Sequence, residues 1–132
     1  MKETVPHIMI VEDEEPIVFS MSFVLRRKGY QVSAAQDGQQ ALDMLTEFMR
    51  ADEVPDLLIC DMNLPVLTGI ELIQKMHEVG VMLPIVAVTG GATAEIIHNL
   101  KVNGCTSVVT KPFDTHLIIE IIEEILSSPD DK

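Results

Sequence analysis

Short apolar runs alternate with longer amphipathic segments along the whole chain. Apolar and β-branched residues fill positions 8–11, 57–60, 85–88 and 108–110, and a more polar run at 31–35 is typical of an edge strand. Helical spacing with start or stop residues occurs at 16–28, 38–50, 69–79 and 92–102, and a last helix capped by Asp114 extends to 126. Five strands that alternate with five helices predict an α/β fold, in which helices cover both faces of a parallel sheet.

Polar residues follow four of these apolar runs directly. Glu12 and Asp13 follow the first run, Asp61 the run at 57–60, Thr89 the next, and Lys111 the last. In an open parallel sheet, ligands bind at the carboxyl ends of the strands, where the strand order reverses. In a doubly wound five-stranded sheet with the flavodoxin-like order 2-1-3-4-5, this point lies between the first and third strands, so the acid pair lies beside Asp61. Carboxylates, a hydroxyl and an ammonium group together suit a divalent metal and a phosphoryl group.

Composition limits the size and the partners of the protein. The 132 residues suffice for one domain (1–132), with a core at about 7–127 and a polar tail at 127–132. Twenty-one acidic residues against nine basic ones give a net charge of −12, which argues against a nucleic-acid-binding surface. No apolar run approaches the roughly 20 residues that a membrane-spanning helix needs. No apolar signal region follows Lys2 at the N-terminus.

The cysteine, histidine and methionine residues are expected to be structural. Cys60 and Cys105 form no CxxC pair and lie in or beside predicted strands, so we expect buried free thiols in a reducing compartment and a cytoplasmic protein. The eight methionines are expected to fill the core. The four histidines lack metal-ligand spacing, and we expect them at surface or boundary positions: His7, His77, His98 and His116.

Four short motifs lie at the predicted strand ends. They are Val11-Glu12-Asp13-Glu14, Asp61-x-x-Leu64-Pro65-x-x-x-Gly69, Thr89-Gly90 and Lys111-Pro112-Phe113. Each motif is common by itself, but the four in this order and spacing are specific. From residue 7 to about residue 127, the chain resembles the receiver domain of response regulators, the phosphorylated part of two-component signalling. The resemblance is to stand-alone receivers of the chemotaxis type.

This resemblance implies a site for phosphoryl transfer. Asp61 would be the phosphoacceptor, taking the phosphoryl group from a phosphohistidine and forming an acyl phosphate. Mg²⁺ would be the cofactor, because a carboxylate nucleophile repels the phosphoryl group unless a cation neutralises the charge. By resemblance, Asp13 and Asp61 supply side-chain oxygens to the metal, Asn63 supplies a backbone carbonyl, and Glu12 makes a contact through water. Lys111 would hold the phosphoryl oxygens or, without phosphate, the Asp61 carboxylate.

The same resemblance implies a conformational switch at Thr89. Its hydroxyl would bond a phosphoryl oxygen and draw the following loop with it, and Gly90 and Gly91 would make that loop mobile. In the alternative interpretation, the two glycines only turn the chain. The peptide bond before Pro112 is expected to be cis. Receivers usually carry an aromatic residue three positions before the motif lysine, where this chain has Val108, so we expect a switch that is small or confined to the loop after Thr89.

The first predicted helix carries two phenylalanines on its outer side. At 100° per residue, Phe19 and Phe23 lie opposite the face expected to reach the core, which carries Ile17, Met21, Val24 and Leu25. Exposed phenylalanines beside the acid crevice suggest a contact patch, unless a loop or tail covers them. By resemblance, a sensor histidine kinase or a histidine phosphotransfer protein would dock on this helix. The sequence does not indicate the downstream protein target.

Three classes of function are compatible with these features. The first is the phosphoacceptor receiver, in which phosphorylation switches partner binding or the phosphoryl group is relayed onward. It is no conventional enzyme but takes part in its own Mg²⁺-dependent phosphorylation and dephosphorylation. The second is a receiver-like binding module that is not phosphorylated, and the intact set of site residues speaks against it. The third is a flavodoxin-like cofactor binder or an aspartate-nucleophile phosphatase. A flavin phosphate needs a Ser/Thr/Gly-rich loop where this chain has four acids at 12–15, and these phosphatases carry a second Asp where it has Asn63.

Overall fold

The computed structural model describes residues 5–127, in which five strands alternate with five helices. The strands are β1 (His7–Val11), β2 (Gln31–Ala35), β3 (Leu57–Asp61), β4 (Ile85–Thr89) and β5 (Ser107–Thr110). The helices are α1 (Glu15–Arg27), α2 (Gly38–Arg50), α3 (Gly69–Glu78), α4 (Ala94–Val102) and α5 (Thr115–Ser127). Lys2 and the predicted polar tail beyond Ser127 lie outside the described residues. No helix in this part of the chain is both long and apolar enough to span a membrane.

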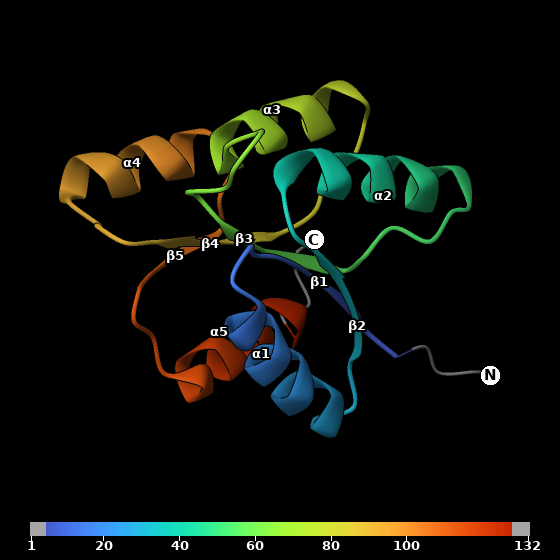
Figure 1. Cartoon of the computed structure of the whole chain (residues 1–132), viewed down its shortest axis with the longest axis horizontal. Helices are drawn as coiled ribbons and strands as arrows, with labels where there is room; N and C mark the ends of the chain where they lie inside the picture. The colour runs from blue at the N-terminus through green and yellow to red at the C-terminus, as the bar shows by residue number, and fades with distance from the viewer. Residues whose placement is uncertain (1–4, 128–132) are drawn as a thin grey trace.

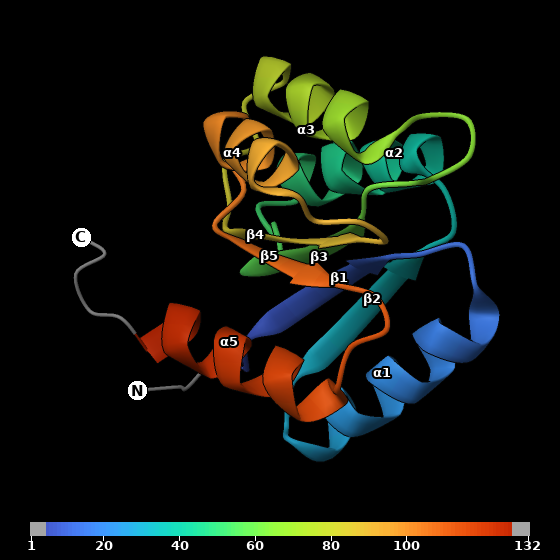
Figure 2. The same cartoon turned by 90° about the vertical axis from the view of Figure 1, so that its left-hand side faces the viewer.

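The five strands form one parallel sheet in the predicted order β2-β1-β3-β4-β5. The polar strand β2 lies at one edge, as predicted, and β5 lies at the other. Helices α2, α3 and α4 cover one face of the sheet, and α1 and α5 cover the other (Figure 1). The side view shows the same three layers (Figure 2). Because β1 and β3 are neighbours, with Val11 paired to Cys60, the loops that follow these two strands start side by side.

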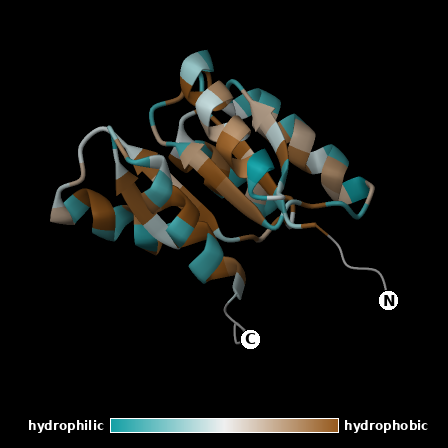
Figure 3. Cartoon of the chain, turned by 90° about the horizontal axis from the view of Figure 1, so that it is seen from below, coloured by the Kyte–Doolittle hydropathy of each residue, from teal (hydrophilic) through white to brown (hydrophobic). Residues whose placement is uncertain are grey.

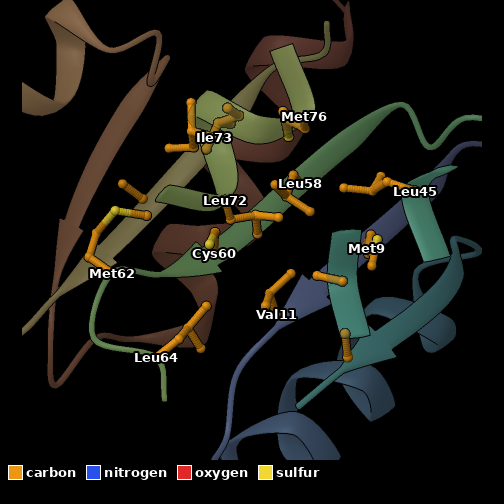
Figure 4. Packing of buried hydrophobic residues seen from close by; sticks show 14 of the residues in the cluster. Met9, Val11, Leu45, Leu58, Cys60, Met62, Leu64, Leu72, Ile73 and Met76 are labelled. Carbon is orange, nitrogen blue, oxygen red and sulfur yellow. The ribbon is translucent and has the colours of Figure 1, made fainter. Parts of the chain in front are cut away.

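Side chains of the central strands alternate between two hydrophobic clusters, one on each face of the sheet. In β1, Met9 and Val11 belong to the cluster under α2 and α3, and Ile8 and Ile10 belong to the cluster under α1 and α5. Figure 3 shows mainly hydrophobic strands between helices of mixed character. Figure 4 shows part of the first cluster, including Met9, Leu45, Leu58, Cys60, Leu72 and Met76. A strand buried on both faces is apolar at every position, which explains the continuous runs in the sequence.

Side-chain caps lie at the starts of α2, α3 and α4, and the caps of α2 and α4 bear on the sequence predictions. Asp37 caps α2 as predicted, because its carboxylate accepts a hydrogen bond from the backbone N–H of Gln40. Helix α4 begins at Ala94, two residues later than predicted. The residue before it, Thr93, is extended, and its hydroxyl accepts a hydrogen bond from the backbone N–H of Ile96. The sequence interpretation had overlooked this threonine as a cap.

Two side chains are placed differently from the sequence expectations. His7 is buried within β1, where its Nε2 lies 2.6 Å from Ser33 Oγ and its ring meets the Phe48 ring edge-on. His7 was expected at the surface or a boundary, because the first apolar run of the sequence begins only at residue 8. Met82 was expected in the core, but it is 71% exposed in the loop between α3 and β4. Cys60 and Cys105 are buried free thiols, as predicted.

Candidate functional site

The predicted site residues gather at the carboxyl edge of the sheet, on four different strands. Glu12 directly follows β1, Asp61 ends β3, Thr89 ends β4, and Lys111 directly follows β5. Backbone hydrogen bonds continue the strand pairing past these ends. The N–H of Glu12 donates to the Ala35 carbonyl at 3.0 Å, and the N–H of Lys111 donates to the Thr89 carbonyl at 2.8 Å. The rigid sheet therefore positions these side chains.

Three carboxylates converge at this edge. One oxygen each of Glu12, Asp13 and Asp61 lies within 4.8 Å of the others. Glu12 and Asp61 are buried, whereas Asp13 is exposed. Burial raises the pKa of Glu12, and the nearby Asp61 charge adds to this rise, against the lowering effects of the Glu14 N–H and of Lys111. Buried like charges so close together repel each other, so the cluster favours a bound cation.

Lys111 provides a positive charge to this cluster. Its Nζ lies 3.1 Å from Asp61 Oδ2, 3.4 Å from Glu12 Oε2 and 3.5 Å from Glu14 Oε2. Burial by itself lowers the pKa of Lys111, but the hydrogen bond to Asp61 and the charges of Asp61 and Glu12 outweigh it, and the pKa is raised. The ammonium group is therefore firmly protonated and held among carboxylates. The contact with Glu14 was missed from the sequence, although the position of Glu14 directly after the acid pair was a usable signal.

The loop after β3 orients Asp61 and packs tightly against α3. Asp61 Oδ1 accepts a hydrogen bond from the backbone N–H of Asn63 at 2.9 Å. The side chain of Asn63 is exposed, and the role of its carbonyl as a metal ligand stays a prediction. Gly69 begins α3 so close to this loop that a Cβ there would lie 2.8 Å from Met62 Cα. The motif glycine is thus explained by close packing beside Asp61.

Thr89 lies on the strand next to Asp61, at the start of the β4–α4 loop. Asp61 pairs with Val88 in the sheet, so Thr89 is one residue beyond this pair. Its hydroxyl donates to the Gly91 carbonyl at 3.1 Å. A Cβ at Gly90 or Gly91 would meet no atom within 4 Å, so the loop has open space around it. The role of Thr89 in a conformational switch stays a prediction.

Two further expectations concern the last strand. The peptide bond between Lys111 and Pro112 is cis, as predicted. Val108 is half-buried and packs against the cluster under α2 and α3. An aliphatic side chain of this size fills less space than an aromatic ring and has no large rotamer swing available.

The oxygen ligands at this site fit a magnesium ion. Mg²⁺ is a hard cation that takes carboxylate oxygens together with several waters. Glu12, Asp13 and Asp61 offer only oxygens, and the exposed Asp13 leaves the cluster open to solvent on one side. These three carboxylates are the side chains of this site that could hold the ion.

A pocket of about 580 Å³ opens beside Lys111, between α1 and the loop that leads into α5. Ile17 and Ser20 line it from α1, and Phe113 and Thr115 line it from the other side. Lys111 also lines this pocket, and its ammonium contacts Asp61.

Comparison with known proteins identifies the family. The sequence model of the response regulator receiver domain matches residues 8–123. This chain belongs to the response regulator receiver domain family. The receiver is 31% identical over 119 residues to sporulation initiation phosphotransferase F of Bacillus subtilis (strain 168), with 90% of this chain and 92% of that protein covered. The predicted family and the class of phosphoacceptor signalling proteins are therefore confirmed.

Two other relatives support the same assignment. The receiver is 33% identical over 120 residues to the alkaline phosphatase synthesis transcriptional regulatory protein PhoP of Bacillus subtilis (strain 168), covering 90% of this chain but only 48% of that protein. It matches the crystal structure of a CheY-like response regulator receiver domain protein from Methanospirillum hungatei JF-1 with a TM-score of 0.81. The two are 28% identical, and the match covers 93% of this chain and 94% of that one. The flavodoxin-like fold is confirmed, and proteins of this family are signalling modules that generally bind Mg²⁺.

Proposed function

We propose that Asp61 is the phosphoacceptor of this receiver, and that Mg²⁺ held by Glu12, Asp13, Asp61 and the Asn63 carbonyl is needed for the transfer. The observation that carries the proposal is the position of Asp61. It ends the central strand, lies between Glu12 and the strand of Thr89, and is bonded to the ammonium of Lys111. A nucleophile in this position has the acid pair after β1 on one side, and the Thr89 hydroxyl and the Lys111 ammonium at the ends of β4 and β5 on the other.

In the proposed reaction, an Asp61 oxygen attacks the phosphorus of a phosphohistidine. The new O–P bond makes an acyl phosphate, and the P–N bond breaks with its electrons returning to the donor imidazole. Mg²⁺ supplies charge neutralisation for the carboxylates and the phosphoryl oxygens. Lys111 exchanges its bond with Asp61 for a bond to a phosphoryl oxygen. The Thr89 hydroxyl leaves the Gly91 carbonyl and donates to a second phosphoryl oxygen, which draws the β4–α4 loop toward the site.

We propose that the donor is a sensor histidine kinase or a histidine phosphotransfer protein. The pocket beside Lys111 supports this, because its apolar residues Ile17 and Phe113 offer a docking surface next to the ammonium group. We also propose that the receiver works in the cytoplasm, where Cys60 and Cys105 stay reduced. Burial raises the pKa of Cys105 to about 11, which keeps that thiol unreactive.

Phosphorylation by a small acyl phosphate tests the assignment of Asp61. With acetyl phosphate and Mg²⁺, mass spectrometry should find one phosphoryl adduct on wild type and on the control Asp43→Asn, an exposed helical residue. Asp61→Asn should carry no adduct. A wild-type adduct on another residue contradicts the proposal, and no adduct at all favours a receiver that acts only by binding.

Isothermal titration with Mg²⁺ tests the metal site separately. Asp13 is exposed, so Asp13→Asn should leave the fold intact while removing one charged ligand. We expect the dissociation constant to rise by about tenfold or more, which corresponds to ~1.4 kcal/mol. An unchanged affinity in both Asp13→Asn and Asp61→Asn would place the metal elsewhere.

A further inference from the structure

Phe19, Phe23, Arg26 and Arg27 form a continuous patch on α1, which we call the α1 outer surface. Phe19 is 74% exposed and Phe23 is 54% exposed, so none of the residues that the structure describes covers them. Together with Ser22, the four residues line a shallow pocket of about 300 Å³. The core-facing residues Met21 and Leu25 already anchor the helix, so these two rings are not needed for packing. Exposed aromatic rings grouped in this way are typical of a contact surface.

The two arginines of this surface have no acidic partner within residues 5–127. The guanidinium of Arg27 lies 5.7 Å from the centre of the Phe23 ring, and Arg26 Nη2 donates only to the Val32 carbonyl at 3.4 Å. The salt bridges of the described chain involve Lys28, Arg50 and Lys111 instead. Lys75 and Lys101 also lack a salt bridge within residues 5–127, but among these four unpaired basic residues only Arg26 and Arg27 line a pocket together with exposed phenylalanines. The α1 outer surface is thus a cationic and apolar area on an acidic protein.

This surface is separate from the pocket beside Lys111. That pocket is lined from α1 by Pro16, Ile17, Ser20 and Met21, and it includes none of the four residues of the α1 outer surface. The sequence had suggested that Phe19 and Phe23 receive the phosphoryl donor. That expectation stays a prediction. The two areas share no lining residue, so a donor held at the pocket beside Lys111 would leave the α1 outer surface available for another contact.

We propose that the α1 outer surface docks an acidic amphipathic segment of a partner protein. Phe19 and Phe23 are one helical turn apart, so apolar side chains on one face of a partner helix can cover both rings. Burial of the two rings against such side chains removes their apolar surface from water, which favours the contact. Aspartate or glutamate side chains beside those apolar positions pair with Arg26 and Arg27, whose planar guanidinium groups bind carboxylates through two hydrogen bonds.

Charge favours a protein segment over the other anionic partners. Nucleic acid and anionic membranes present many negative charges over a wide area. A protein with a net charge of −12 repels such surfaces, and two arginines do not offset this repulsion. A short segment with two or three carboxylates places its charge only where the arginines lie. The contact uses neither Asp61 nor a metal, so it goes beyond the proposed function and does not depend on it.

A displayed library of random helical peptides tests the chemistry of the partner. Peptides are selected on the wild-type protein and depleted on the Phe19→Ser/Phe23→Ser variant. We expect the selected peptides to combine apolar residues one turn apart with adjacent aspartate or glutamate. Fluorescence anisotropy then measures the affinity of the best peptide and of the same peptide with glutamine in place of its acids.

Matched variants locate the contact. The double variant Arg26→Gln/Arg27→Gln should bind the best peptide about tenfold or more weakly than wild type does. The peptide with glutamine in place of its acids should lose a similar factor of affinity for the wild-type protein. Two controls change exposed residues of similar kind elsewhere, Met82→Ser and Lys101→Gln, and should bind as wild type does. Asp61→Asn should also bind unchanged, which separates this result from the test of phosphorylation.

Several results would overturn the proposal. They are the absence of any peptide that distinguishes wild type from the phenylalanine variant, enrichment of peptides without acids, and equal binding by the arginine variant. If the wild-type protein bound phosphatidylglycerol vesicles or oligothymidylate more tightly than the best peptide, the partner would be a membrane or a nucleic acid and not a protein segment. Sedimentation that shows a wild-type dimer, lost in the phenylalanine variant, would make a second copy of this chain the partner.

Discussion

Lys111 Nζ lies 3.1 Å from Asp61 Oδ2, and this contact joins the ends of β5 and β3 across the strand β4 that separates them. The same ammonium lies 3.4 Å from Glu12 Oε2 at the end of β1. One flexible side chain therefore compensates two buried carboxylates that belong to neighbouring strands. A bound cation or a phosphoryl group at this edge must share these carboxylates with Lys111 or displace it.

Replacing Lys111 should make the fold more dependent on magnesium. In Lys111→Met, Glu12 and Asp61 stay buried without their cation, and we expect a loss of ~1–3 kcal/mol in the free energy of unfolding without metal. Mg²⁺ should restore part of this loss, so it should stabilise the variant more than wild type. Urea unfolding with and without Mg²⁺ measures both effects. Lys101→Met, an exposed residue of α4, is the control, and equal stabilisation of variant and wild type by Mg²⁺ would contradict the prediction.

The response to a phosphoryl mimic should be concentrated in the β4–α4 loop. Thr89 is bonded to Gly91, and the two glycines of that loop have open space, whereas Val108 packs into the core without an aromatic ring that could swing. On addition of beryllofluoride and Mg²⁺, amide chemical shifts should change more at 89–94 than at 107–110. Asp61→Asn should show neither change. Larger shifts along β5 would mean that Val108 transmits the switch by another route.

His7 should make the stability of the fold depend on pH. Burial lowers the pKa of His7 below its ordinary value of 6.5, although the charges of Asp56 and Glu53 act in the opposite direction. Below that ordinary value, the unfolded chain binds a proton that the folded chain does not. The contribution of His7 is therefore complete above pH 6.5 and is lost as the pH falls from there to the lowered pKa.

Urea unfolding of His7→Gln across this pH range isolates the effect. Wild type should lose stability relative to His7→Gln as the pH falls. The control His98→Gln changes an exposed histidine of α4 and should keep the wild-type slope. Parallel curves for wild type and His7→Gln would show that His7 titrates equally in both states.

Val66 should be a site of local strain in the loop that follows Asp61. It lies in the loop between Asp61 and α3 with φ at +70°, and its side chain is 78% exposed. A left-handed conformation costs an L-residue roughly 1–2 kcal/mol, and a β-branched side chain adopts it least readily. Val66→Gly removes this strain, but glycine also increases the conformational entropy of the unfolded chain. We therefore expect a net gain of ~0.5–1 kcal/mol in the free energy of unfolding, measured by thermal or urea unfolding.

Asp52 is the matched control for Val66. It also has a positive φ, of +60°, but aspartate accepts this conformation more easily than valine does. Asp52→Gly should therefore gain less stability than Val66→Gly. An equal gain at both positions would indicate a general effect of glycine in loops and no special strain at Val66.

The sequence by itself determined the order of the elements and the residues at the strand ends. Runs such as 57–60 are apolar at every position because a central parallel strand is buried on both faces, and this pattern depends little on the details of packing. Once the strands are parallel, their carboxyl ends share one edge of the sheet. The meeting of Glu12, Asp13, Asp61 and Lys111 follows from this rule and from the strand order 2-1-3-4-5 of a doubly wound sheet.

The tertiary structure decided what surrounds each of these residues. Met82 is exposed because no other element within residues 5–127 packs over it, whereas the contact of His7 with Phe48 and that of Lys111 with Glu14 each join residues from different elements. The same holds for the separation of the α1 outer surface from the pocket beside Lys111. Periodicity along a chain shows which side chains share a face of a helix or strand. It does not show which neighbour covers that face, because neighbours are brought together by packing between segments that are distant in the sequence.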